Sequence, residues 1–340
     1  MVTFVSMSES SFSFIIPVYN RPEEIRELLE SFKALKTELP YEIVIVEDGS
    51  QEKSDAVVRD FQEALDISYY YKENSGPGDS RNYGMAKAKG NYFIILDSDC
   101  ILPNHYLNAV DASLKEAFVH CFGGPDAAHE SFSKVQKAIN FSMTSFITTG
   151  GIRGKENSVG KFQPRSFNMG LSKTAFLATQ GFGKIHPGED PDLTIRLWRL
   201  GYKTKLIPHA FVYHKRRISW RKFYKQVNKF GLVRPILNKR YPETNKPVFW
   251  MPTLFVAGLL VALLLAVLGN TLLLMAYACY FTLGFLVALW DTKNLYVAIM
   301  AVYAIFIQFL GYGWGFLRAT WFVGVLNRNP KQVFPHLFFK

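Results

Sequence analysis

The stretch Tyr92-Phe93-Ile94-Ile95-Leu96-Asp97-Ser98-Asp99 decides the fold of the first half of the chain. Its five consecutive apolar residues predict a buried β-strand, which the acidic turn then ends. Asp97 and Asp99 are two positions apart, so in extended backbone their carboxylates project to the same face and can address one ion. Carboxylate oxygens suit Mg²⁺ or Mn²⁺. Taken alone, however, the motif is more often an ordinary surface turn.

Strands of the same kind precede this stretch, and amphipathic helices separate them. The predicted strands are Phe12–Val18, Tyr41–Val46 and Ile67–Tyr71. The predicted helices are Pro22–Lys36, Glu52–Leu65 and Ser80–Ala88. Strands that alternate with helices of about 10–15 residues indicate an α/β domain with a largely parallel, doubly wound sheet.

Polar clusters follow three of the predicted strands, at residues 19–20, 47–50 and 97–99. In doubly wound sheets, ligands bind beyond the carboxyl ends of the strands, so these clusters mark the expected site. The sequence after the first strand has neither the glycine fingerprint of dinucleotide-binding proteins nor a P-loop. A metal ion held by carboxylates is therefore the expected partner for the phosphates of a bound nucleotide.

Asp48 lies in the second of these clusters, Glu47-Asp48-Gly49-Ser50. The alternative interpretation is again a plain turn, with Gly49 in the left-handed region. Two acidic turns at the same edge of one sheet are more informative than either alone. A lone histidine such as His214 is more often structural than a ligand, but it would complete a metal shell if the chain returned to Asp99.

A further acidic cluster, Glu189-Asp190-Pro191-Asp192, precedes a predicted helix. Pro191 suits the first helical position, so Asp190 is the predicted N-cap. The positive end of the helix dipole favours a carboxylate in its charged form. Asp190 at that position would therefore have a lowered pKa and be a weak base.

Charge is unevenly distributed along the 340 residues, whose formal net charge is +11. Residues 215–246 carry eleven Lys or Arg and one acidic residue, Glu243. The other 28 basic and 27 acidic residues nearly cancel, which argues against a nucleic-acid partner. The cysteines, Cys100, Cys121 and Cys279, are scattered and odd in number, which fits neither a disulfide framework nor a zinc site and favours a reducing compartment.

A long apolar region follows the basic residues, without any charge between Phe249 and Trp290. Three segments reach the roughly 20 apolar residues that a helix needs to cross a bilayer: 249–268, 271–290 and 295–317. A helical hairpin buried in a soluble core is the alternative, which 42 consecutive uncharged residues disfavour. The third segment is also open to interpretation as a re-entrant helix, or one broken at Gly311, Gly313 and Gly315, so the number of crossings stays open.

The basic segment indicates which side of the membrane the first domain occupies. Lys and Arg gather in cytoplasmic segments, so residues 1–246 are expected in the cytoplasm, on a multi-pass protein of the cell (inner) membrane. Aromatic and apolar residues recur at helical spacing among the basic ones: Trp220, Phe223, Tyr224, Val227 and Phe230. They indicate a helix in the headgroup plane, or equally an ordinary helix packed on the sheet.

Taken together, the motifs resemble those of glycosyltransferase family 2, inverting enzymes of the GT-A fold, over about residues 12–230. The matching pieces occur in the family's order: Pro17-Val18-Tyr19-Asn20, Glu47-Asp48-Gly49-Ser50, Gly76-Pro77-Gly78 with Ser80-Arg81-Asn82, Asp97-Ser98-Asp99, Asn168-Met169, and Glu189-Asp190-x-Asp192-Leu193-x-x-Arg196. No single piece is specific, whereas the ordered set is. Glu47 departs from the family's usual aspartate, which affects the donor preference rather than the donor site.

The resemblance implies roles for the matched residues. Asp190 would be the catalytic base, and the metal, Mn²⁺ or Mg²⁺, would be held by Asp99, Asp97 and His214. The nucleotide-sugar donor would be bound by Pro17, Tyr19, Glu47, Asp48, Arg81, Asp97 and Ser98. Of these, Tyr19 would stack on the base and Asp48 would hydrogen-bond it. The sugar and acceptor pocket would be lined by Asn168, Met169 and Glu189.

The implied reaction moves a hexose from a nucleoside-diphosphate sugar to a hydroxyl of a membrane-associated glycan, linked to polyprenyl diphosphate, in surface polysaccharide synthesis. A polyisoprenyl-phosphate hexose synthase is the alternative enzyme, which the Glu189-Asp190 pair disfavours. A processive synthase is disfavoured because residues 216–220, RRISW, lack the second arginine of the Q/R-x-x-R-W motif. A membrane scaffold with a degenerate nucleotide fold is the alternative that is not an enzyme.

The predicted organisation has four parts. They are a GT-A catalytic domain (1–214), a basic amphipathic segment (215–248), the transmembrane helices (249–317) and a C-terminal tail (318–340). The fold class is therefore α/β, a Rossmann-like and mostly parallel sheet, followed by transmembrane helices.

Overall fold

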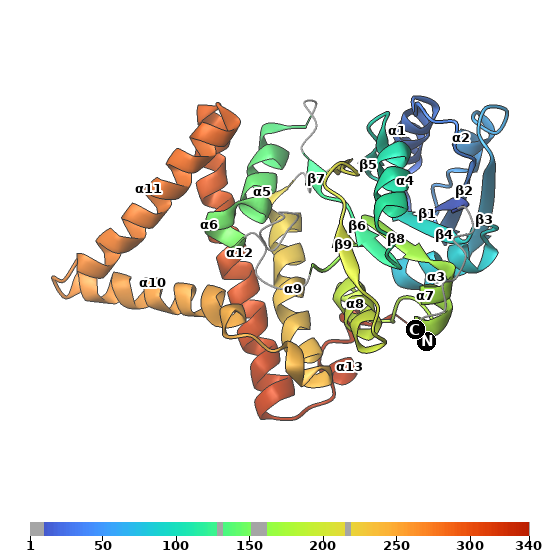
Figure 1. The fold of residues 1–340 in the computed structure, drawn as a ribbon. Helices are drawn as coiled ribbons and strands as arrows, with labels where there is room; N and C mark the ends of the chain where they lie inside the picture. The colour runs from blue at the N-terminus through green and yellow to red at the C-terminus, as the bar shows by residue number, and fades with distance from the viewer. Residues whose placement is uncertain (1–9, 128–131, 151–161, 215–218, 340) are drawn as a thin grey trace. The chain divides into compact units, whose positions relative to one another are not determined.

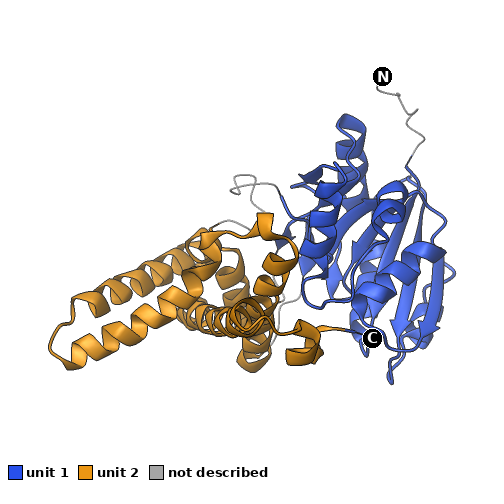
Figure 2. Ribbon diagram, turned by 90° about the horizontal axis from the view of Figure 1, so that it is seen from below, with its two compact units in different colours: residues 1–127, 160–214, 339–340 blue, residues 128–159, 215–338 orange. Residues whose placement is uncertain are grey.

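The computed structural model describes residues 10–127, 132–150, 162–214 and 219–339. The chain divides into two compact units, drawn in blue and orange in Figure 2: unit 1 comprises residues 1–127, 160–214 and 339–340, and unit 2 comprises residues 128–159 and 215–338. This division differs from the predicted continuous domain over residues 1–214. The described residues 132–150 lie between two parts of unit 1 in the sequence but belong to unit 2 with the later helices.

Unit 1 is built on a seven-stranded sheet of order β3-β2-β1-β4-β8-β6-β9 (Figure 1). Its strands are β1 (Phe12–Val18), β2 (Tyr41–Asp48), β3 (Ile67–Lys72), β4 (Tyr92–Leu96), β6 (Cys121–Gly123), β8 (Asn168–Ser172) and β9 (Thr204–Leu206). Strands β1 to β4 are parallel, whereas β8 runs antiparallel to both β4 and β6. The prediction of a mostly parallel α/β sheet is confirmed.

The helices of unit 1 bury both faces of this sheet. They are α1 (Pro22–Lys33), α2 (Asp55–Arg59), α3 (Pro77–Lys87), α4 (Tyr106–Glu116), α7 (Lys173–Thr179) and α8 (Glu189–Arg199). Successive residues of β1 enter different cores: Phe14 packs with the apolar face of α1, and Ile15 packs with Met85 of α3. A strand covered on both sides is therefore apolar throughout, as the sequence of β1 predicts.

Helix α2 is shorter than the predicted helix over residues 52–65. Beyond Arg59 most backbone hydrogen bonds span three residues rather than four, as from Phe61 N to Val58 O (3.0 Å) and from Ala64 N to Phe61 O (3.0 Å). Such bonds tighten the chain into successive turns, so the apolar spacing continues although the α-helix does not.

A small second sheet brings two distant parts of unit 1 together. It has the order β5-β10-β7, with β5 at Cys100–Ile101, β7 at Asp126–Ala127 and β10 at Val212–His214. In the antiparallel pair of β5 and β10, His214 is the partner of Cys100. The chain therefore returns to the position next to Asp99, which is the condition on which the prediction of His214 as a ligand depended.

Unit 2 is helical in its described residues. Its elements are α5 (Lys134–Thr144), α6 (Phe146–Thr149), α9 (Trp220–Arg240), α10 (Met251–Val267), α11 (Leu272–Thr292), α12 (Leu295–Ala319) and α13 (Pro330–Val333), with short 3₁₀ turns at Pro242–Thr244, Pro247–Trp250 and Pro335–Leu337 and a π-helical turn at Thr320–Val325. Among the described residues, three helical segments are long and apolar enough to cross a membrane: Pro247–Val267, Leu272–Thr292 and Leu295–Val325.

The third apolar helix is continuous, so the interpretation of a segment broken at its glycines was wrong. Helix α12 runs from Leu295 to Ala319 without interruption, and its glycines are sites of close packing. A Cβ atom on Gly315 would collide with the carbonyl oxygen of Asn228 in α9, and one on Gly311 would lie 3.3 Å from Tyr224 O. Glycine therefore lets the two backbones approach rather than ending the helix.

Helix α9 packs along α12, an arrangement that neither sequence interpretation contained. Its buried face includes Phe223, Val227 and Leu232, and Asn228 Nδ2 donates a hydrogen bond to Gly311 O (2.9 Å). A Cβ atom on Gly231 of α9 would in turn collide with Tyr312 O. Three basic residues in the first two turns of α9, Arg221, Lys222 and Lys225, are exposed.

Candidate active site

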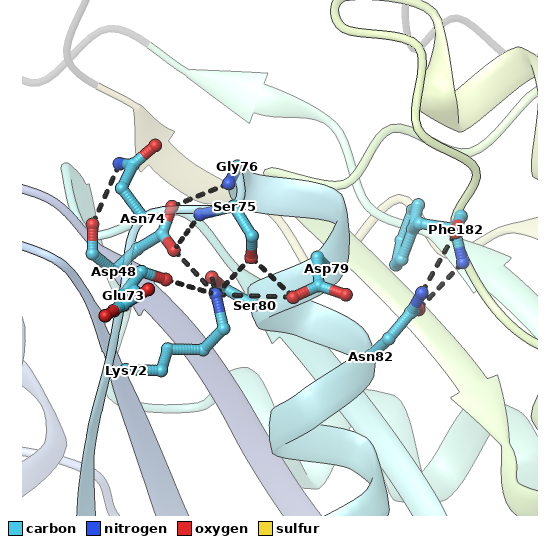
Figure 3. A network of polar contacts seen from close by, with 10 residues as sticks. All are labelled: Asp48, Lys72, Glu73, Asn74, Ser75, Gly76, Asp79, Ser80, Asn82 and Phe182. Carbon is cyan, nitrogen blue, oxygen red and sulfur yellow. Dashed lines mark hydrogen bonds and ion pairs between the residues drawn. The ribbon is translucent and has the colours of Figure 1, made fainter. Parts of the chain in front are cut away.

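Asp48 ends β2 and is surrounded by the loop that follows β3 (Figure 3). Its Oδ1 accepts hydrogen bonds from Lys72 Nζ (2.8 Å) and Ser75 N (3.0 Å), and its Oδ2 accepts one from Gly76 N (3.0 Å). Asn74 Nδ2 donates to the backbone carbonyl of Asp48 (2.8 Å). The carboxylate is therefore held at the carboxyl edge of the sheet by two backbone amides and one ammonium group.

Glu47 precedes Asp48 in the strand, and its side chain is completely buried. One carboxylate oxygen accepts a hydrogen bond from the hydroxyl of Ser50, and the other accepts from Ser54 N (2.8 Å) and Tyr69 Oη (2.9 Å). Both oxygens thus have partners within unit 1. The geometry gives Glu47 the task of shaping the loop after β2, whereas direct contact with a donor stays a prediction.

Arg81 of α3 connects two of the acidic clusters. Its Nη2 donates to Asp97 Oδ1 (2.7 Å) and its Nη1 donates to Glu189 Oε1 (3.2 Å), and its side chain is only 4% exposed. Burial opposes the charged form of Arg81, but the charges of Asp97 and Glu189 raise its pKa. One buried cation therefore joins carboxylates that are 92 residues apart in the sequence.

Asp99 lies between two basic groups. Arg21 Nη1 donates to its Oδ2 (2.6 Å), and His214 Nε2 lies 3.2 Å from its Oδ1. Burial favours the neutral acid, but the charges of His214 and Arg21 outweigh it and hold the pKa of Asp99 well below its usual range. Asp99 is therefore an anionic oxygen ligand at the edge of the sheet.

The residues around Asp99 fit a divalent cation. Donor atoms of Asp99, Cys100 and His214 all lie within 4.8 Å of one another, and the imidazole of His214 lies 3.2 Å from the buried Asp99 Oδ1. Burial raises the pKa of the Cys100 thiol well above its usual value. The carboxylate of Asp99 and the imidazole of His214 are donors that could hold a divalent cation here.

Asp190 lies in the first turn of α8 and is not the N-cap, so that prediction was wrong. Helix α8 begins at Glu189, and its N-cap is Gly188, whose φ of 120° is a conformation that favours glycine. Pro191 is then the third helical residue rather than the first. Because N–H groups of the first turn have no partner within the helix, proline is tolerated there as well.

The carboxylate of Asp190 lies in a buried environment that favours its neutral form. Its Oδ1 is buried and has no hydrogen-bond partner among the described residues. Burial, and after it the neighbouring charge of Glu189, raises the pKa of Asp190, while Arg81, Arg165 and a hydrogen bond from Ser166 oppose the shift. The predicted lowering of this pKa by the helix terminus is therefore outweighed.

Glu189 has the opposite electrostatic environment. Burial alone would raise its pKa, but His186, whose Nδ1 lies 2.8 Å from Glu189 Oε1, and Arg81 together lower it to about 2. Glu189 therefore stays ionised at neutral pH next to an acid whose pKa is raised. Adjacent carboxylates with separated pKa values are a common arrangement for acid–base chemistry.

The side chain of Met169 is completely buried in the core with Val44 and Phe93. Its place in the acceptor pocket stays a prediction. Asn168 is also fully buried; Tyr106 Oη donates to its Oδ1 (2.5 Å) and its Nδ2 donates to Ala210 O (2.8 Å). Residues of β8 alternate between two covered faces, which leaves neither side chain open.

The other predicted donor residues differ in exposure. Tyr19 follows β1 and is 51% exposed, as a side chain that stacks on a base would be before binding. Pro17 is buried within β1, and Ser98 is buried between the two aspartates of its motif. Their contacts with a donor stay predictions.

Three residues of the site were missed from the sequence: Arg21, Lys72 and His186. The sequence could have indicated Lys72, because it ends β3 at the position that pairs with Asp48 in the parallel register. Arg21 directly follows the Tyr19-Asn20 cluster, but its partner Asp99 is 78 residues away. His186 lies only three residues before Glu189, so this contact is local in the sequence, but it was not predicted.

Comparison with known proteins relates the first half of the chain, with Asp48, Arg81, Asp97 and Asp99, to a known family. Residues 13–173 match the model of Glycosyl transferase family 2. An uncharacterized glycosyltransferase of Rickettsia typhi is 38% identical over 114 residues, which cover 32% of this chain and 35% of the relative. Chondroitin synthase of Escherichia coli is 27% identical over 236 residues, covering 60% of this chain and 34% of the relative. The chain thus spans about a third of the length of these relatives.

A solved structure shares the fold. A mannosyltransferase from Pyrobaculum calidifontis, solved in complex with GDP-Man and Mn²⁺, superimposes with a TM-score of 0.56 at 15% sequence identity, covering 95% of this chain and 89% of that one. At this identity the likeness concerns the fold, which is a GT-A-like domain followed by long apolar helices.

Proposed function

We propose, on the premise that residues 13–173 form a glycosyl transferase family 2 domain, that the protein transfers a hexose with inversion from a nucleoside-diphosphate sugar to a hydroxyl of a membrane-associated glycan. The observation that carries this proposal is the buried bridge of Arg81 between Asp97 and Glu189. It supports a single site in which the donor-side carboxylates and the proposed base act on one substrate pair.

On the acceptor side, Asp190 removes the proton of the attacking hydroxyl. The hydroxyl oxygen then forms a bond to the anomeric carbon, while the bond from that carbon to the diphosphate breaks and its electron pair leaves with the nucleoside diphosphate. One displacement without a covalent intermediate inverts the anomeric centre. Positioned proton transfer of this kind contributes about 10²–10⁴-fold to the rate, and the raised pKa of Asp190 suits it to the task.

On the donor side, Tyr19 stacks on the base and Asp48 accepts a hydrogen bond from it. Asp97 faces the ribose or the sugar, with Arg81 holding its carboxylate in place. Asp99, Asp97 and His214 would hold the metal, Mn²⁺ or Mg²⁺, which would neutralise charge on the diphosphate. Arg21 donates a hydrogen bond to Asp99 Oδ2 and so orients this carboxylate.

The acceptor is proposed to be linked to polyprenyl diphosphate, with the glycan used in a surface polysaccharide. The support is the presence of three membrane-length apolar helices in the same chain as the transferase domain. Exposed lysine and arginine on α9 are the side chains expected to meet anionic headgroups. On this proposal the transferase domain lies at the cytoplasmic face of the cell membrane.

Incubation of the purified full chain in lipid nanodiscs with a panel of nucleotide sugars tests the proposal. A lipid-linked saccharide is the acceptor, and release of UDP or GDP is measured in Mn²⁺, in Mg²⁺ and in EDTA. We expect release with one donor and one acceptor hydroxyl, and loss of release in EDTA. Transfer to a bare polyprenyl phosphate would instead identify a polyisoprenyl-phosphate hexose synthase.

Thermal unfolding distinguishes an enzyme from a scaffold. A ligand that binds only the folded chain stabilises it by mass action, about 2.7 kcal/mol at a hundred times its dissociation constant. We expect UDP or GDP to raise the unfolding temperature in the presence of Mn²⁺. A chain that no nucleoside diphosphate stabilises, and that releases none from any donor, would be a scaffold.

A further inference from the structure

Phe339 returns the chain to unit 1 after the helices of unit 2. Its backbone N–H donates a hydrogen bond to Lys184 O (3.0 Å). Its ring lies on the backbone of Gly76, where any Cβ atom would collide with three of the ring carbons, and its centroid is 5.8 Å from that of the His186 ring. One aromatic side chain thus contacts two loops that are more than 100 residues apart in the sequence.

Each of these loops holds a carboxylate of the candidate site. Gly76 N donates to Asp48 Oδ2 (3.0 Å), as Figure 3 shows. His186 Nδ1 lies 2.8 Å from Glu189 Oε1, and the charge of Glu189 contributes to the raised pKa of Asp190. A single residue, Gly76, therefore links Phe339 to Asp48. Another single residue, His186, links Phe339 to Glu189.

Gly76 is suited to this contact by its lack of a side chain. Its φ of 95° is a backbone conformation that other residues rarely adopt, and the space beyond its Cα is filled by the ring of Phe339. The ring also lines a small pocket together with Ser75, Asn82, Phe182 and His186. Removal of the ring would therefore open space beside both loops rather than exchange one contact for another.

We propose that Phe339 is a positioning residue that holds Asp48 and Glu189 at their places in the site. This inference rests on the proposed function, because it assigns these carboxylates to donor binding and to the base. It acts through two separate contacts, one to Gly76 and one to His186. A displacement of about 1 Å in a reacting group is enough to cost about 10²-fold in rate, so a packing contact at this distance has a measurable effect on catalysis.

The test compares Phe339→Ala with Phe339→Leu and with Phe338→Ala, which removes the same side chain from the neighbouring position. The dissociation constants of UDP and GDP in Mn²⁺ are measured by calorimetry on the full chain, together with kcat and KM for the donor. We expect Phe339→Ala to weaken nucleotide binding about tenfold and to lower kcat about tenfold. Phe339→Leu should restore most of both, and Phe338→Ala should stay within about twofold of the wild type.

A double-mutant cycle with His186→Ala separates the two contacts. If Phe339 acts on kcat through His186, its removal in the His186→Ala background leaves kcat nearly unchanged but still weakens nucleotide binding. If Phe339→Ala lowered kcat by the same factor in the His186→Ala background as in the wild type, that half of the inference would be overturned. A binding constant that Phe339→Ala does not change would overturn the other half.

Amide hydrogen exchange gives a readout that does not depend on the reaction. Phe339→Ala should speed exchange in residues 73–78 and in residues 183–190, and Phe338→Ala should not. If the wild type neither binds a nucleoside diphosphate nor releases one, the proposed function fails, while this exchange still measures whether Phe339 holds the two loops. If amide hydrogens in both loops of Phe339→Ala exchanged at the wild-type rate, the inference would be overturned even in an active enzyme.

Discussion

The acidic edge of unit 1 and the seam between α9 and α12 in unit 2 are both closely packed, but by opposite means. At the edge, charged side chains from distant segments meet at hydrogen-bond distance, as Arg81 does with Asp97 and Glu189. At the seam, Gly231 and Gly315 have no side chain, so backbone atoms of the facing helix approach them closely. Chemistry requires the first kind of contact, whereas the second serves only to bring helices together.

This difference determines which substitutions each region tolerates. A charge at the edge can be neutralised without a change of volume, so its chemical role can be separated from its packing. An added methyl group at the seam has no space, because protein interiors are packed as densely as organic crystals. Five predictions follow from this contrast, from the largest expected effect to the smallest.

Asp190→Asn removes the proposed base and keeps its shape. We expect kcat to fall by about 10²–10⁴-fold, because a positioned proton acceptor is lost. The dissociation constant for UDP or GDP in Mn²⁺ should stay within about twofold, since Asp190 does not contact the nucleotide in the proposal. Glu30→Gln, at an exposed position of α1, is the matched control for loss of a carboxylate. Near-normal turnover of Asp190→Asn would refute the assignment.

Arg81→Met removes the buried cation between two carboxylates. We expect a loss of about 3–5 kcal/mol in the free energy of unfolding of unit 1, because Glu189 is then left buried with one charged partner fewer. Denaturant titration of the full chain in detergent micelles measures it. Arg59→Met is the control: Arg59 is 65% exposed in its ion pair with Asp55, and such a pair is worth about 0–1 kcal/mol. Equal stabilities of the two variants would contradict the bridging role of Arg81.

Gly315→Ala tests the seam. The added Cβ meets the carbonyl oxygen of Asn228, so the helices must separate, at an expected cost of about 1–3 kcal/mol in the stability of unit 2. In Gly324→Ala, the Cβ would lie 3.8 Å from Thr320 Cγ2, an ordinary contact, and stability should change little. Thermal unfolding in micelles measures both variants. If Gly315→Ala were as stable as Gly324→Ala, the close approach of α9 and α12 would not depend on glycine.

Glu189→Gln tests the electrostatic coupling within the acidic edge. The negative charge of Glu189 contributes to the raised pKa of Asp190, and a base must be deprotonated to accept a proton. Removal of that charge lowers the pKa of Asp190, so the acidic limb of the kcat profile should move to lower pH. Glu30→Gln should leave the limb in place. A limb that moves to higher pH, or does not move, would show that Asp190 and Glu189 are not coupled in this way.

The same pair affects stability against pH in opposite directions. The pKa of Glu189 is lowered from its usual 4.5 to about 2, so the stability that it contributes is present above the unfolded value and is lost as the pH falls through this range. Asp190, with a raised pKa, destabilises the fold where it is ionised. Stability measured between pH 2 and 5 therefore falls less steeply in Glu189→Gln than in the wild type.

The local pattern of apolar and polar residues was sufficient to predict the main strands and helices and their order along the chain. The runs at β1 and β4 predicted both strands with the bounds that the structure shows, because a strand buried on two faces is continuously apolar. The three apolar helices were predicted to within two residues at each end by length and composition alone. Asp48 and Asp97 were predicted at the carboxyl edge, since a parallel sheet brings its strand ends together.

The sequence by itself thus determined the α/β sheet, the apolar helices and the edge at which polar groups gather. Only the tertiary structure decided which charges meet there, that Gly188 rather than Asp190 begins α8, that Met169 lies in the core, and that the described residues 132–150 belong to unit 2. The physical reason is the separation along the chain over which each kind of interaction acts. Apolar periodicity acts between near neighbours in the chain, whereas the partners of a charge depend on segments that topology brings together across tens to hundreds of residues.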